Sequence, residues 1–276
     1  MRLAKLLPLC LVVLLTGWTQ TLKIESWPAP FQDAVKVTAR FWPAPIAAGR
    51  APAVVLQHGC GGWYGDNIDN WALWFNARGY HALAIDSFEA RGHKDGICAS
   101  LATGAKVGLT ARTEDAYGGL AWLRARDDVD PSKVVLMGFS NGGTTALYAA
   151  TVGKVPRGVP EDARFAAVIA MYPWCGVGAN AGSFETNAPI QIVIGGLDDW
   201  TSPRLCDKSK ENQVPGLKFE VETLPGVYHS FDMTAWRGQP VGARSYLGHR
   251  LEPNADAVVR TAEIIEAFLV GEGLLP

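Results

Sequence analysis

Six short apolar segments, each ending in turn residues, most constrain the fold of this 276-residue chain. They span residues 53–59, 80–86, 133–140, 165–173, 190–196 and 217–226, and an alternating segment at 35–41 precedes them. Several are apolar nearly throughout, which is typical of parallel strands buried on both faces. Helical patterns at 70–79, 112–126, 141–150 and 254–269 lie between or after these strands. The alternation predicts an α/β fold: a mostly parallel central sheet flanked by helices. No linker divides the chain, so we expect a single domain.

The segment VVLMGFSNGG, residues 134–143, places Ser140 among glycines between a predicted strand and a predicted helix. A sharp turn at this point would lift the serine hydroxyl to the top of the sheet, as in the G-x-S-x-G nucleophile elbow. The alternative is a glycine-rich turn with a serine that caps the helix. The surrounding strand and helix favour the nucleophile.

A serine nucleophile needs a base, and histidine is the usual one. His229 follows the last predicted strand in LPGVYHSFD, where a loop can carry it over the carboxyl edge of the sheet. His249 has no strand before it, and His58, His81 and His93 have the pattern of structural residues.

The third group should orient the imidazole. The segment IVIGGLDDW offers Asp198 and Asp199 directly after a strand. Asp198 fits the strand-G-x-x-D spacing and is the preferred candidate, whereas Asp199 could instead point outward. The order serine, acid, histidine is that of α/β-hydrolases. The oxyanion donors would then be the backbone N–H of Asn141, after the nucleophile, and that of Cys60 in QHGCGGW.

The segments HGCGGW, DSFEARG, GFSNGG, YPWC, GGLDDWTSP and YHSFD, in this order, resemble the dienelactone hydrolase family of the α/β-hydrolase superfamily. The resemblance implies a single-domain hydrolase with Ser140, Asp198 and His229 as nucleophile, acid and base. It also implies hydrolysis of an ester or lactone without a metal or cofactor. The namesake enzymes use cysteine, so this chain is similar to a serine-bearing, exported branch.

Other readings on the same fold are a serine peptidase, an acyltransferase or a non-catalytic binding protein. Retention of all three triad residue types argues against the last. Substrates of open α/β sheets bind beyond the carboxyl ends of the strands. The candidates for the pocket wall are therefore Trp63, Trp174 and Trp200, with weaker ones at Tyr64, Phe88 and Trp236.

Residues 1–20 resemble a signal peptide, with a basic start and a short apolar run, and the hydrolase domain would span 21–276. We expect export to the periplasm or medium, although the leader could be retained as an anchor; without it, no stable membrane insertion is expected. Cys60, Cys98, Cys175 and Cys206 then remain. Cys175 with Cys206 and Cys60 with Cys98 is the favoured disulfide pairing, because each pair follows two successive strands. Free thiols are the alternative without export.

The formal net charge of −2 gives no indication of a nucleic-acid partner. The sequence contains no C-x-x-C pair, so a zinc site is not expected. The expected partner is a small-molecule ester or lactone, and the oligomeric state is left open.

Overall fold

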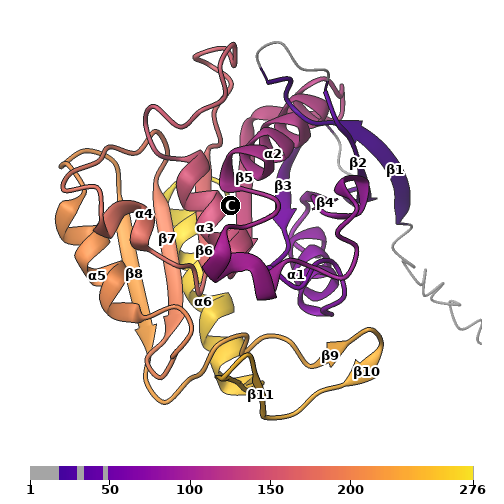
Figure 1. The fold of residues 1–276 in the computed structure, drawn as a ribbon. Coiled ribbons are helices and arrows are strands. Elements are labelled where there is room, and N and C mark those ends of the chain that lie inside the picture. The colour runs from indigo at the N-terminus through magenta and orange to yellow at the C-terminus, as the bar shows by residue number, and fades with distance from the viewer. Residues whose placement is uncertain (1–18, 30–33, 46–48, 276) are drawn as a thin grey trace, which may run out of the picture.

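A computed structural model describes residues 19–29, 34–45 and 49–275 of the chain, so residues 1–18 of the expected leader lie outside it. Figure 1 shows a central sheet with helices packed on both of its faces. The sheet has eight strands in the order β1-β2-β4-β3-β5-β6-β7-β8. Their bounds are β1 (Gln20–Glu25), β2 (Lys36–Trp42), β3 (Ala51–Gln57), β4 (His81–Asp86), β5 (Val129–Phe139), β6 (Ala167–Met171), β7 (Ile190–Gly195) and β8 (Phe219–Leu224).

The strands from β4 to β8 pair in parallel, while β1 and β2 are antiparallel additions at one edge. The parallel strands are apolar because both faces are covered; β6 and β7 have no exposed residue at all. This confirms the expected α/β-hydrolase architecture with a mostly parallel sheet. It also brings the carboxyl ends of β3, β5, β6, β7 and β8 to one edge, where the polar loops follow.

Six α-helices complete the described layers: α1 (Asn67–Asn76), α2 (Leu109–Arg124), α3 (Asn141–Ala149), α4 (Gly176–Ala179), α5 (Pro203–Asn212) and α6 (Ala255–Gly271). In Figure 1, α2 and α3 lie in front of the sheet and α6 lies behind it. Arg78, two residues after the end of α1, pairs with Glu266 of α6 at 2.7 Å. The cap of α6 is made by Asn254, whose side chain accepts the N–H of Ala257.

Helix α2 begins at Leu109, three residues before the helical pattern at 112–126, and has no acid in its first turn. Arg112 instead lies near the N-terminus, with its side chain fully buried. A cation at this end opposes the helix dipole.

Two small hairpins after β8 were not predicted from the sequence. One joins β9 (Ala235–Trp236) to β10 (Gln239–Pro240), and the other joins β11 (Arg244–Tyr246) to β12 (His249–Leu251). Each turns through two residues of positive φ, the second of them a glycine: Arg237 with Gly238, and Leu247 with Gly248. Strands of two or three residues are too short to show alternation. The hairpins extend below the sheet in Figure 1.

Two disulfides join Cys60 to Cys98 and Cys175 to Cys206, as the order of the strands predicted. The first ties the loop after β3 to the 3₁₀ helix η2 (Cys98–Thr103), and the second ties the loop after β6 to α5. The bonds are compatible with an oxidising compartment. No helix in the described part of the chain has the length and apolar character needed to cross a membrane.

We expect the double variant Cys175→Ala, Cys206→Ala to lose about 2–4 kcal/mol of unfolding free energy, because the bond restricts the unfolded chain. Urea unfolding of oxidised wild type and variant measures this. A loss below about 0.5 kcal/mol would mean that the bond does not restrict the unfolded chain as this model requires.

Candidate active site

Ser140 occupies a sharp turn between β5 and α3, with φ 52° and ψ −117°. This left-handed conformation is strained for a residue with a side chain. Glycines permit the turn: a Cβ on Gly138 would lie 2.1 Å from the carbonyl oxygen of Gly142, and one on Gly142 would lie 2.1 Å from that of Gln57. The N–H of Ser140 donates to the carbonyl of Met171 at 2.9 Å. Close packing of β3, β5 and β6 thus holds the turn.

The side chain of Ser140 does not cap α3, although the residue stands at the N-cap position. Its Oγ lies 3.0 Å from Nε2 of His229 instead. Of the two interpretations of this serine, the structure therefore supports the nucleophile-elbow geometry.

His229 lies after β8 and is buried, with Nδ1 2.7 Å from Oδ2 of Asp198. Because a carboxylate can only accept here, Nδ1 carries the proton and Nε2 is free to accept one. Asp198 also accepts the N–H groups of Trp200 and Thr201 through Oδ1. The hydroxyl of Thr201 lies 2.9 Å from Oδ2 of Asp198. These donors fix the position of the buried carboxylate beside His229.

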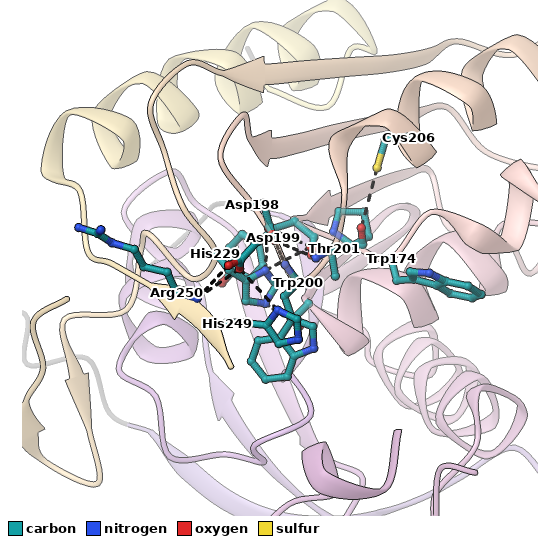
Figure 2. A network of polar contacts seen from close by, with 12 residues as sticks. Trp174, Asp198, Asp199, Trp200, Thr201, Cys206, His229, His249 and Arg250 are labelled. Atoms are coloured by element: carbon teal, nitrogen blue, oxygen red, sulfur yellow. Dashed lines mark hydrogen bonds and ion pairs between the residues drawn. The ribbon is translucent and has the colours of Figure 1, made fainter. Parts of the chain in front are cut away.

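Asp199 and His249 lie together outside this hydrogen-bonded chain, and Figure 2 shows both beside it. Asp199 accepts the backbone N–H of Arg250 at 3.2 Å and lies 3.6 Å from Nδ1 of His249. The His249 ring stacks on Trp200 at 5.0 Å. Asp199 therefore ties the loop after β7 to the β11–β12 hairpin, and the two aspartates have separate surroundings.

A second buried network supports the loop that carries His229. Asp232 accepts hydrogen bonds from the hydroxyl of Tyr172 at 2.6 Å and from Nε1 of Trp71 at 2.8 Å. Burial raises the pKa of Asp232. The Tyr172 ring meets the His229 ring edge-on at 4.8 Å. The network links α1, the end of β6 and the His229 loop.

Of the two expected oxyanion donors, Cys60 lines the cavity. Asn141 directly follows Ser140, which also lines it, at the start of α3. Among the described residues, neither the N–H of Asn141 nor that of Cys60 has a protein acceptor. His58 supports this loop: its Nε2 accepts the N–H of Ser87, and its Nδ1 lies 2.8 Å from the carbonyl of Gly59. Burial lowers the pKa of His58, which keeps the ring neutral and structural.

A cavity of about 470 Å³ opens over Ser140 and His229. Trp200 lines it, as does Trp236 from the β9–β10 hairpin, whose ring lies where a Cβ on Gly61 would be. The prediction that Trp63 and Trp174 line the pocket is wrong. The Trp63 ring packs against the guanidinium of Arg40 in β2 at 4.2 Å and is not part of the cavity wall.

Trp174 is 42% exposed, and Figure 2 shows it apart from the His229 cluster. Its backbone N–H donates a hydrogen bond to the hydroxyl of Thr144, which ties the segment after β6 to α3. The weaker candidates Tyr64 and Phe88 are also outside the cavity wall. Sequence reasoning missed other wall residues, several of them from the unpredicted hairpins: Ile68, Met233, Val241, Tyr246 and Leu251.

Three supporting residues were also missed: Thr201, Asp232 and Arg112. Thr201 and Asp232 lie three positions after Asp198 and His229. Polar residues at this short distance from a triad member are the signal that could have found them. In the described parts of the chain, no group of three or more His, Cys, Asp or Glu side chains could hold a metal ion.

The sequence model of the dienelactone hydrolase family matches residues 40–263, so the chain belongs to that family. Thermogutta terrifontis esterase 2 phosphoramylated by tabun is similar in fold, with a TM-score of 0.64, 19% identity and coverage of 97% of this chain and 99% of the other. A dienelactone hydrolase-like promiscuous phosphotriesterase from metagenomic libraries has a TM-score of 0.65, 20% identity and coverage of 94% and 100%.

The quorum-quenching protein AidA of Acinetobacter baumannii (strain MDR-ZJ06) is 31% identical over 123 residues, 45% of this chain and 36% of AidA. The chain spans less than half the length of the curated relatives it matches.

We expect Asp198→Asn to lower kcat by on the order of 10³–10⁴-fold, because an amide at this position would donate to Nδ1 of His229 and move the ring proton to Nε2. Asp199→Asn, a matched control one residue away, should stay within about threefold of wild type. Steady-state hydrolysis of p-nitrophenyl acetate, with circular dichroism to check folding, measures both. A larger loss in Asp199→Asn would assign the acid to that residue.

Proposed function

We propose that this protein hydrolyses a small-molecule carboxylic ester or lactone through an acyl-enzyme at Ser140. The observation that carries the proposal is the continuous hydrogen-bonded chain from Ser140 Oγ to His229 Nε2 at 3.0 Å and from His229 Nδ1 to Asp198 Oδ2 at 2.7 Å. In this proposal Ser140 is the nucleophile, His229 the general base and acid, and Asp198 the residue that orients the imidazole.

In the first half-reaction, His229 Nε2 takes the proton of Ser140 as Oγ attacks the substrate carbonyl carbon. The carbonyl π electrons move to oxygen and form the oxyanion, which the N–H groups of Cys60 and Asn141 stabilise. Collapse of this intermediate breaks the bond to the alcohol oxygen, and His229 gives that oxygen its proton. The acyl group remains on Ser140.

In the second half-reaction, His229 takes a proton from water as the water oxygen attacks the acyl carbon. The oxyanion forms again and collapses, the bond to Ser140 Oγ breaks, and His229 returns the proton to that oxygen. The products are the carboxylic acid and the free enzyme. Asp198 stays ionised throughout and stabilises the imidazolium that forms twice.

The cavity wall supports an ester or lactone with an apolar portion. Trp200, Trp236, Met233 and Leu251 supply apolar surface near Ser140. The relatives support the same chemistry. Thermogutta esterase 2 has been captured as a phosphoramylated enzyme, and the metagenomic relative is a promiscuous phosphotriesterase.

We also propose that residues 1–20 direct export and that 21–276 form the mature hydrolase. The two disulfides support this proposal because such bonds persist in oxidising compartments.

Replacing Ser140 with alanine should abolish turnover of p-nitrophenyl acetate, with a loss of several orders of magnitude, up to about a millionfold. Ser209→Ala is the matched control, because Ser209 is a buried serine of α5 outside the cavity wall. Initial rates at equal concentrations of folded protein decide the matter. Retention of more than about a tenth of the activity in Ser140→Ala would rule out this nucleophile.

A further inference from the structure

Arg112 is a fully buried cation beside the candidate active site. Burial lowers the pKa of its guanidinium to about 9, against the opposing attraction of Asp115 and Asp86, so the group stays charged at neutral pH. Both carboxylate oxygens of Asp115 accept hydrogen bonds from Arg91, each at 2.9 Å. Desolvating a guanidinium is costly, and its place near the N-terminus of α2 adds an unfavourable dipole. A strong local interaction must offset this cost.

The hydrogen bonds of Arg112 identify that interaction. One terminal nitrogen donates to the carbonyl oxygen of His58 at 2.5 Å, and the other donates to Oδ1 of Asn141. Both acceptors are neutral oxygens of the two segments that frame the cavity. The face of the guanidinium lies over the Phe88 ring at 4.9 Å, which closes it off from solvent.

These two segments are the ones that present the oxyanion donors. His58 is two residues before Cys60 in the loop after β3, and Asn141 itself carries the second donor N–H. No other bond between a side chain of α2 and Asn141 exists among the described residues. The planar guanidinium holds both acceptors in one fixed geometry, which a lysine ammonium cannot reproduce. Arg112 thereby sets the spacing between the two halves of the oxyanion site.

We propose that Arg112 is the positioning residue of the oxyanion hole. This proposal rests on the proposed function. Arg112 acts through Cys60 and Asn141, without touching the substrate. Oxyanion donors act where charge develops in the transition state, so a change in their spacing lowers kcat and leaves ground-state binding nearly unchanged.

The main test uses Arg112→Lys, which keeps the positive charge and much of the volume. We expect kcat for p-nitrophenyl acetate to fall about 100-fold, with KM within about threefold of wild type. An aryl trifluoromethyl ketone, which forms an oxyanion on the attacking serine, should lose affinity by a similar factor. Activity is expressed per active site titrated by the acylation burst, so partial unfolding does not imitate the effect.

Arg40→Lys is the matched control. Arg40 also lies over an aromatic ring, but its carboxylate partner is Asp69 of α1 and no hydrogen bond joins its side chain to His58 or Asn141. Its kcat per titrated site and its trifluoromethyl ketone affinity should match wild type. A second variant, Arg112→Ala, should recover part of its kcat when guanidinium is added below denaturing concentrations, whereas Arg40→Ala should not respond.

Wild-type kcat per site in Arg112→Lys, or equal losses in the Arg112 and Arg40 variants, would overturn the proposal. So would a rise in KM with unchanged kcat. If wild type fails to hydrolyse esters, or Ser140→Ala remains active, the proposed function itself fails. The positioning role alone fails when those two proteins behave as proposed but the Arg112 variants keep full kcat per site.

Discussion

The left-handed backbone at Ser140 is the constraint on which the rest of the site depends. A conformation of this kind costs on the order of 1–3 kcal/mol and persists only where the surroundings determine it. Here a side chain at Gly138 or Gly142 would collide with neighbouring backbone, because β3 and β6 pack directly against the turn. The strain presents Oγ above the sheet edge while leaving the next N–H at the start of α3, free of the helix's own hydrogen bonds.

Around that turn, the carboxylates of Asp198 and Asp232 are buried and hydrogen-bonded. Asp198 receives three donors besides the imidazole, and Asp232 anchors the loop that carries His229. In a low-dielectric place such contacts are stronger and their geometry is more rigid than in water. In the proposed mechanism, these fixed hydrogen bonds orient His229, and the folded structure maintains the arrangement before substrate binds.

The central sheet could be predicted because its strands are apolar throughout and end in recognisable turns. The serine, histidine and aspartate could be predicted because each follows a strand, and parallel strands bring their carboxyl ends together. The pocket wall could not. Trp63 and Trp174 also follow strands, but side-chain direction depends on contacts such as Arg40 with Trp63 and Thr144 with the N–H of Trp174. Arg112 was missed because a helical pattern gives no indication of which cation will be buried.

The most direct measurement of the central claim is covalent capture of the nucleophile. Wild-type protein is treated with a fluorophosphonate, digested and mapped by mass spectrometry, with His229→Ala and His249→Ala treated in parallel. The account predicts one adduct, on Ser140, that forms at a similar rate in His249→Ala and more slowly by orders of magnitude in His229→Ala. An adduct on another residue, or rapid labelling of Ser140 without His229, would contradict it.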